Sequence, residues 1–268
     1  TYPTKYHFLY IFIATFCIRA LVFQYYIQHN ERYRQADSMD YHNCAVGIAH
    51  GTGMHRADNL KPIFWRTPGY PVLLGALYKA YGMNSTRFEK NHTTHMIFLW
   101  LQIIVCSFTP IILFYLAFML TANLLIAYLL TLIAMLHPGF VLSSMYMLTE
   151  GIAIMLFYLF LLFFYRSFHS YGEYKKTPKK TDWKYSLIYA GIALAAYTWM
   201  RPMGEFVLIT ALILLCIVAA DSWRLKLQKC MLLFSTFALC VLPWYIRNYN
   251  LTGKWFFCPM SGAYLNTF

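Results

Sequence analysis

The chain alternates long apolar runs with short polar connections. Seven of the runs approach the roughly 20 residues that a helix needs to cross the hydrocarbon core of a bilayer. They are residues 8–27, 96–118, 122–142, 146–166, 184–200, 204–220 and 231–246. This pattern predicts an all-α polytopic bundle of seven transmembrane helices.

Three shorter features refine this prediction. Proline cannot continue the helical hydrogen-bond ladder, so Arg201-Pro202 separates the fifth and sixth spans. Residues 70–82 are apolar but too short to cross, which predicts an interfacial or re-entrant helix. Residues 37–53 begin with an acid, carry apolar positions at helical spacing and end in glycines, which predicts a short helix with an acid at its head.

Composition agrees with a membrane protein whose main partner is the lipid bilayer. Hydrophobic residues make up 60% of the 268 positions and charged residues 12%, against roughly 45–50% and about 25% in soluble domains. The net charge of +12 is compatible with nucleic-acid binding, positive cytoplasmic loops or an anionic substrate. Nucleic acid is excluded as a partner because the basic residues lie in short segments between apolar spans.

Lysine and arginine in short loops mark the cytoplasmic side of a membrane protein. Two connections are basic, through Arg166, Lys175, Lys176, Lys179, Lys180 and Lys184 in the first and Arg224, Lys226 and Lys229 in the second. Both are expected in the cytoplasm. The N-terminus is then cytoplasmic, and the long loop 28–95 faces the periplasm or lumen of a bacterial inner membrane or an ER-type membrane.

This topology places many of the chain's ionisable groups at the outer face. They are Asp37, Asp40, Arg66, Glu150, Arg201, Glu205 and Arg247. Ionised groups at membrane depth are costly and tend to face a protein-lined cavity, so the set predicts a polar site. The alternative is that helix ends carry charges at an interface without further function.

Several short motifs occur in order along most of the chain. Besides residues 37–53 they are WRTPGYP at 65–71, LTE at 148–150, TWMRP at 198–202 and PWYIRNYNLTG at 243–253. Together they resemble the GT-C superfamily of glycosyltransferases, in the lineage of protein O-mannosyltransferases and the aminoarabinose transferase of lipid A. The resemblance implies an inverting enzyme that moves a sugar from a polyprenyl phosphate to a lipid-linked or protein acceptor on the extracytoplasmic or lumenal side.

The resemblance also implies a catalytic acid in the first outer loop. Asp37, followed by Tyr41 and Ala45, fits the family's frame and is the expected base, with Asp40 in reserve. A hydroxyl acceptor needs a carboxylate to take its proton, and a departing lipid phosphate needs preplaced cations. The predicted donor-binding residues are Arg66, Arg201, Arg247, Tyr41 and Tyr70.

Glu150 occupies the place where the relatives' pattern often has a second acid. It could bind a divalent cation with Asp37, orient the acceptor or hold an arginine, or it could simply favour the dipole of its helix. Oxygen ligands at Asp37 and Glu150 would suit Mg²⁺ or Mn²⁺. No zinc spacing is present among the histidines and cysteines.

The chain is expected to form one GT-C-like transmembrane module over residues 1–268, whose C-terminal region is missing or truncated relative to larger relatives. Two other functions remain open. A transporter or flippase of an anionic lipid could use the same arginines, although such proteins often show internal repeats. A non-catalytic membrane subunit derived from such an enzyme would act with a membrane-protein partner.

Overall fold

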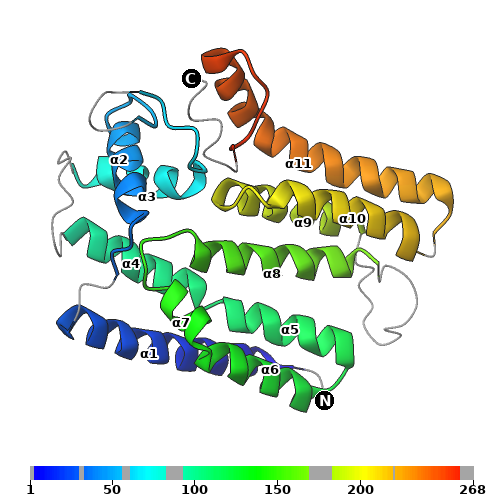
Figure 1. Cartoon of the computed structure of the whole chain (residues 1–268). Coiled ribbons are helices and arrows are strands. Elements are labelled where there is room, and N and C mark those ends of the chain that lie inside the picture. The colour runs from blue at the N-terminus through cyan, green and yellow to red at the C-terminus, as the bar shows by residue number, and fades with distance from the viewer. Residues whose placement is uncertain are drawn as a thin grey trace. The chain divides into compact units, whose positions relative to one another are not determined.

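A computed structural model describes residues 3–29, 33–55, 61–82, 93–168, 183–219 and 221–259. The described residues are helical, apart from connections and one isolated bridge between His55 and Pro62, so the predicted all-α fold is confirmed. The helices are α1 (Lys5–His29), α2 (Ser38–Ala49), α3 (Gly69–Ala80), α4 (Thr93–Cys106), α5 (Thr109–Thr121), α6 (Leu124–Leu136), α7 (Pro138–Ser143), α8 (Glu150–Arg166), α9 (Trp183–Met200), α10 (Gly204–Val218) and α11 (Trp223–Thr252) (Figure 1).

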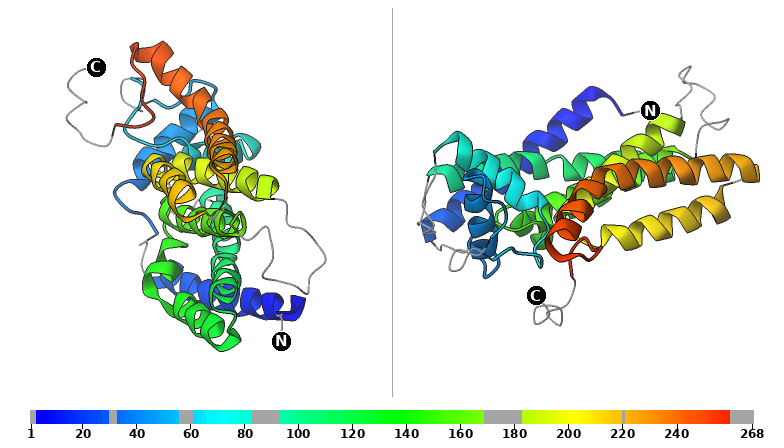
Figure 2. Two further views of the ribbon diagram at one scale, coloured as in Figure 1. Left: turned by 90° about the vertical axis from the view of Figure 1, so that its right-hand side faces the viewer. Right: turned by 90° about the horizontal axis from the view of Figure 1, so that it is seen from above.

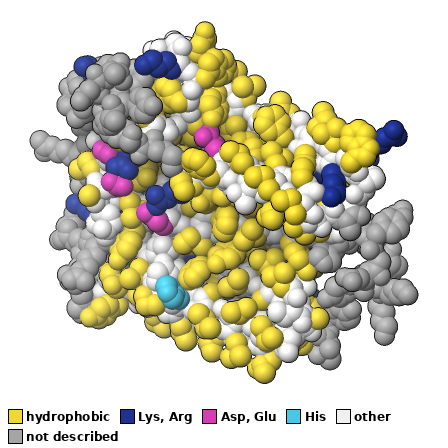
Figure 3. All heavy atoms as spheres, turned by 45° about the vertical axis from the view of Figure 1, so that its right-hand side comes forward, with side chains coloured by type: hydrophobic (Ala, Val, Ile, Leu, Met, Phe, Trp, Pro, Cys, Tyr) yellow, Lys and Arg dark blue, Asp and Glu magenta, His cyan; other side chains and the backbone are white. Residues whose placement is uncertain are grey.

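Three of the described helical stretches are long and apolar enough to cross a bilayer: Lys5–Gln28, Thr93–Thr121 and Trp223–Thr252. Large apolar side chains project outward from these and shorter helices; Leu21 and Ile217, for example, are 73% and 74% exposed. The face drawn in Figure 3 is accordingly covered mainly by hydrophobic side chains. Such a surface suits lipid as its solvent, so the chain is an integral membrane protein.

Proline divides two of the predicted spans. Residues 96–118 form α4 and α5, separated at Ser107 and Phe108, with Pro110 in the first turn of α5. Residues 122–142 form α6 and α7, with Pro138 beginning α7. Proline has no N–H to donate to the preceding turn, which explains both breaks. The predicted span 96–118 still lies within one apolar helical stretch, Thr93–Thr121, whereas residues 122–142 form two separate helices.

The chain divides into two compact units, Thr1–Met155 and Leu156–Phe268. In the first, α1 packs along α4 and α5, and α2 packs against α3 (Figure 2). Gly75 permits the second contact, because a Cβ atom there would lie 2.9 Å from the carbonyl oxygen of Ala45. The short helices predicted at 37–53 and 70–82 are thus present, and they form one pair.

In the second unit, α9 and α10 both pack against α11. Their shared core includes the wholly buried Leu187, Leu194, Leu215 and Leu233. The chain breaks between α9 and α10 around Pro202, as predicted. Helix α11 extends well beyond the predicted span 231–246, because its polar first two turns continue the same helix before the apolar stretch begins. The lysines at 175, 176, 179 and 180 lie outside the described residues.

A buried lysine ties the connections of this unit together. The Lys229 ammonium, whose side chain is only 2% exposed, lies 2.7 Å from a carboxylate oxygen of Asp221. It also donates to the carbonyl of Ser167, at 3.2 Å, and lies 5.7 Å from the ring centroid of Trp183. One cation therefore joins the end of α8, the start of α9 and the turn before α11.

Replacement of Lys229 by Met is expected to lower the stability of the protein by about 1–3 kcal/mol. Loss of one partner from a fully buried ion pair costs about 3–5 kcal/mol, and the partial exposure of Asp221 reduces this figure. The change is measurable as a lower apparent Tm in detergent. Arg224→Met is the matched control, since Arg224 is an exposed cation one turn earlier in α11. Equal Tm shifts for the two variants would contradict the conclusion that Lys229 holds these connections together.

Candidate active site

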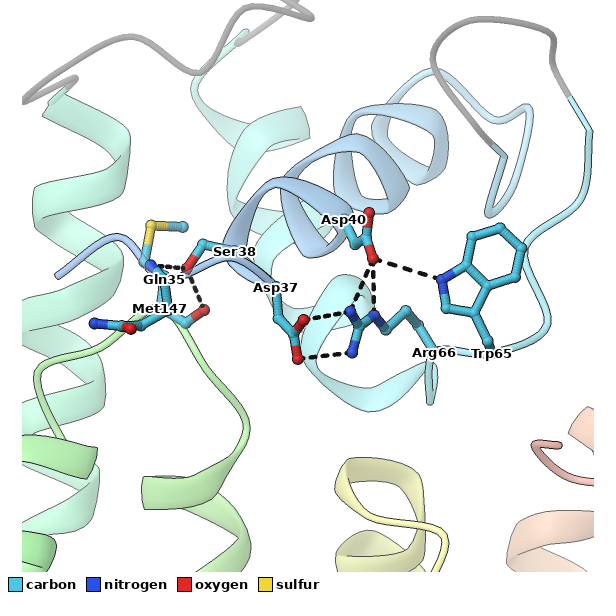
Figure 4. Close-up of polar contacts among 7 residues, drawn as sticks. All are labelled: Gln35, Asp37, Ser38, Asp40, Trp65, Arg66 and Met147. Atoms are coloured by element: carbon cyan, nitrogen blue, oxygen red, sulfur yellow. Dashed lines mark hydrogen bonds and ion pairs between the residues drawn. The ribbon is translucent and has the colours of Figure 1, made fainter. Parts of the chain in front are cut away.

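The first helix of the long loop, α2, begins with an aspartate that does not cap it. Asp37 occupies the N-cap position, where an acid ordinarily accepts a hydrogen bond from the helix's own N–H groups. Here its side chain makes no such bond. Instead the carboxylate points away from the helix toward Arg66, as Figure 4 shows. Its hydrogen bonds therefore go to Arg66 and not to the backbone of its own helix.

Arg66 joins the two aspartates of this helix (Figure 4). Its two terminal nitrogens meet the two oxygens of Asp37 at 2.8 and 2.5 Å, the side-by-side geometry that a guanidinium fork favours. Its Nε and one terminal nitrogen meet Oδ2 of Asp40 at 3.0 and 2.9 Å. These bonds use four of the five N–H groups of the guanidinium. The indole of Trp65 also donates to Asp40, at 3.5 Å.

The side chains of this cluster differ in how far they are exposed to solvent. The Arg66 side chain is 20% exposed, whereas that of Asp37 is 49% exposed. Burial lowers the pKa of Arg66, but its hydrogen bonds to Asp37 and Asp40 and its proximity to Tyr41 outweigh this and raise the pKa above its ordinary value. The arginine is therefore a permanent cation. It lies behind a carboxylate that remains accessible from outside.

Two tyrosines, Tyr41 and Tyr70, pack next to this cluster. The Arg66 guanidinium lies 5.4 Å from the ring centroid of Tyr41, which in turn lies 5.2 Å from that of Tyr70. Tyr70 is fully buried, and its hydroxyl donates to Oε1 of Gln102 in α4 at 3.0 Å. Burial raises the pKa of Tyr70, so this hydroxyl keeps its proton. In this structure Tyr70 packs behind the site, and its predicted contact with the donor stays a prediction.

Glu150 is the first residue of α8, four positions later than the predicted start of that span. It is partly buried, and it belongs to the same unit as Asp37. Its charge contributes to the electrostatic environment of Tyr70. The preceding segment is fixed by Gln102, which donates to the carbonyl of Tyr146 at 2.8 Å, and by Ser38, which donates to that of Met147 at 3.1 Å.

Sequence reasoning overlooked Gln102 and Ser38. Gln102 is the one amide in the apolar stretch 96–118, and polar side chains inside a span commonly join helices. That signal was sufficient to single it out. Ser38 gave no comparable signal, because a serine in the first turn of a helix is common and its partner lies more than a hundred residues away along the chain.

The other predicted donor-binding residues lie in the second unit. Arg201 follows α9 at the break before α10, and its backbone N–H donates to the backbone carbonyl of Tyr197 at 2.7 Å. Arg247 lies in α11 with its guanidinium 4.4 Å from the ring centroid of Trp244. Glu205 accepts a short hydrogen bond from the hydroxyl of Tyr245. The structure thus brings Asp37, Asp40, Arg66, Tyr41 and Tyr70 together, while the joining of Arg201 and Arg247 to them stays a prediction.

The carboxylates were also considered as ligands for Mg²⁺ or Mn²⁺ at Asp37 and Glu150. Both oxygens of Asp37 accept hydrogen bonds from Arg66, so a metal ion there would lie beside a fixed positive charge. Among the described residues no cluster of three His, Cys, Asp or Glu side chains could hold a metal ion. A fixed cation beside Asp37 and the small number of neighbouring ligands among the described residues do not fit such an ion.

Removal of divalent ions with EDTA is therefore expected to leave unchanged the rate of the sugar transfer that the sequence resemblance implies. The reason is that Arg66 already supplies the positive charge beside Asp37 that a metal would otherwise provide. The measurement is transfer by purified protein before and after chelation, with magnesium or manganese added back. A loss of activity that either ion restores would contradict this prediction.

Comparison with known proteins gives the family of the chain. Residues 69–252, more than half of the chain, match the family model described as dolichyl-phosphate-mannose-protein mannosyltransferase. The match includes Tyr70, Glu150, Arg201 and Arg247, while Asp37 precedes it. Searches of curated proteins and of solved structures gave no match. The chain therefore belongs to the dolichyl-phosphate-mannose-protein mannosyltransferase family, a family of membrane glycosyltransferases within the GT-C superfamily.

Proposed function

We propose that this protein transfers a sugar, mannose by its family, from a polyprenyl phosphate such as dolichyl phosphate to a hydroxyl group of a protein or lipid-linked acceptor. The observation that carries the proposal is the half-exposed Asp37 carboxylate held on both oxygens by Arg66. A base must be fixed in direction, negatively charged and accessible to its substrate. Asp37 meets these three conditions.

The transfer is a single displacement at the anomeric carbon of the sugar. The acceptor hydroxyl gives its proton to the Asp37 carboxylate while its oxygen forms the new bond to that carbon. The bond between the anomeric carbon and the phosphate oxygen breaks on the opposite side, and the lipid phosphate leaves with the electron pair. Attack opposite the leaving group inverts the configuration of the sugar.

The leaving phosphate gains negative charge, and cations placed in advance stabilise it. Arg201 and Arg247 are the proposed ligands, because a guanidinium meets phosphate oxygens in pairs. Arg247 is held over Trp244 and bound to Asn248 at 2.8 Å, so its guanidinium is already oriented. Arg66 is committed to the two aspartates, and its proposed role is to orient Asp37 rather than to bind phosphate.

We place the reaction on the extracytoplasmic or lumenal side of the membrane. The support is the distribution of basic residues in the sequence: lysine and arginine are concentrated around residues 167–183 and in the first two turns of α11, as they are at the cytoplasmic side of membrane proteins. The long loop that carries Asp37 and Arg66 then lies on the other side. Labelling of a cysteine introduced at exposed Thr52 with a membrane-impermeant reagent, compared with labelling of the native protein and its seven cysteines, tests this orientation.

The proposed function is tested by transfer of radiolabelled mannose from dolichyl phosphate in membranes that contain the protein. Labelled protein or lipid product above the level of membranes without it supports the proposal. Binding of the donor with no product formed would instead favour a carrier of anionic lipids. The lack of both binding and product with dolichyl- and bacterial polyprenyl-phosphate sugars would overturn the proposal.

A further inference from the structure

A buried amide lies at the centre of the first unit. The side chain of Gln102 in α4 is 2% exposed, and each of its polar atoms is engaged. Its oxygen accepts from the hydroxyl of Tyr70 at 3.0 Å. Its nitrogen donates to the carbonyls of Ser144 and Tyr146 at 3.1 and 2.8 Å. Buried amides are costly unless fully bonded, so these contacts fix the side chain in one orientation.

The two ends of this amide lead to Asp37, the proposed base, and to Glu150, the second acid that the sequence predicts. Through its oxygen Gln102 supports Tyr70, which contacts Tyr41, and Tyr41 lies beneath the guanidinium that holds Asp37. Through its nitrogen it holds the carbonyl four positions before Glu150. One side chain therefore joins the support of Asp37 to the segment that leads into Glu150.

A second connection runs parallel to the first. Ser38, the neighbour of Asp37, accepts a hydrogen bond from the N–H of Gln35 and donates to the carbonyl of Met147 (Figure 4). The N–H of Met147 donates to the carbonyl of Tyr33 at 3.0 Å. The segment 144–147 is thus held from α4 and from the start of α2. These bonds bridge stretches of chain that are far apart in sequence.

The first turn of α8 packs tightly against the end of α7. A Cβ atom at Gly151 would lie 2.6 Å from the carbonyl oxygen of Ser143 and 3.0 Å from the sulfur of Cys106. Contacts that short force a shift of backbone, so only glycine allows α8 to begin directly against the end of α7. The backbone of Glu150 is consequently fixed by the same segment that Gln102 holds.

We propose that Gln102 is a positioning residue that sets the place of the Glu150 carboxylate relative to Asp37, with Ser38 as its partner. This inference rests on the proposed function, in which Asp37 is the base, and adds to it a role for Glu150. Glu150 orients the acceptor hydroxyl toward Asp37, and small displacements of such groups reduce rates strongly. Gln102 itself touches neither donor nor acceptor.

The kinetic test compares Gln102→Leu in two backgrounds. In the otherwise native protein we expect kcat to fall by roughly 10–100-fold with little change in the KM for the donor. In a Glu150→Gln protein the same replacement should have little further effect, because the group that it positions has been removed. Equal factors in both backgrounds would overturn the inference and leave Gln102 a general stabiliser of the fold. An unimpaired Glu150→Gln protein would overturn it as well.

Further variants separate the two ends of the amide. Gln102→Glu keeps an oxygen for Tyr70 but turns oxygens toward the carbonyls of Ser144 and Tyr146, so it should resemble Gln102→Leu. Tyr70→Phe removes the other bond alone and should reduce kcat less. Gln24→Leu is the matched control, because Gln24 is exposed on α1. It should leave the rate unaltered.

Hydrogen exchange, which needs no catalytic turnover, tests whether Gln102 holds the segment 144–147. Backbone amides of residues 144–149 should exchange hydrogen faster in Gln102→Leu than in the native protein, while those of α9 and α10 in the other unit should not change. Unchanged exchange at 144–149 would overturn the inference. If the native protein transferred no sugar, the proposed function would fail, and exchange would still decide whether Gln102 holds the segment before Glu150.

Discussion

Replacement of Asp37 by Asn is expected to reduce sugar transfer by about 10²–10⁴-fold, the usual contribution of a general base. Asparagine has the same shape and keeps an oxygen for Arg66, but it cannot take a proton from the acceptor. The donor should still bind, so the loss should appear in kcat. The measurement is mannose transfer from dolichyl phosphate by purified protein, with donor binding followed separately.

Asp40→Asn is the matched control, because Asp40 shares Arg66 with Asp37 and lies one turn further along α2. Its Oδ2 takes three bonds, two from Arg66 and one from Trp65, so it already serves as a structural acceptor. We expect a much smaller loss of kcat for this variant. If Asp40→Asn were the more damaging change, the base would be Asp40, the reserve candidate from the sequence.

The sequence predicted the parts of the site that depend on local patterns. An acid at the head of a short helix and an arginine in a loop fixed by prolines are visible in 37–53 and 65–71. The structure confirms the helix and its stop, where Gly51 and Gly53 adopt positive φ angles of 78° and 86° that suit glycine. It also shows that the two motifs meet, as the prediction of one polar site required.

Long-range pairing could not be predicted in the same way. Arg66 was expected to bind phosphate because arginine and phosphate are complementary, yet carboxylates are equally complementary to it. Which partner it meets depends on how the loop returns to α2, a distance of 29 residues from Asp37. The contact of Gln102 with the segment before Glu150 spans more than forty residues and likewise arises only in the folded chain.

The contacts of Arg66 determine the net charge of the cluster that it forms with Asp37 and Asp40. Two aspartates three residues apart would repel one another, and the single arginine between them attracts both and offsets one of the two charges. The cluster is therefore close to one net negative charge, which resides on groups that face outward. Such a cluster attracts the proton of an acceptor hydroxyl, whereas it would repel a lipid phosphate. Phosphate binding by Arg201 and Arg247 stays a prediction.

Separate measurement of kcat and of the KM for the donor thus distinguishes two roles of Arg66, orientation of Asp37 and binding of the donor phosphate. We expect Arg66→Gln to lower kcat by roughly 10²-fold, because Asp37 loses the fork that aims it and displaced catalytic groups carry costs of that order. The KM for the donor should change little. Arg66→Lys should recover only a small part of the rate, since one ammonium cannot span both oxygens of Asp37 and reach Asp40 as well.

The opposite result has a definite meaning. If Arg66→Gln raised the KM for the donor and left kcat largely intact, Arg66 would bind the phosphate, and its bonds to the aspartates would open when the donor arrives. The double variant with Asp37→Asn separates the two cases. An arginine that acts through Asp37 has no further effect once the base is gone, whereas an arginine that binds the donor weakens donor binding in either background.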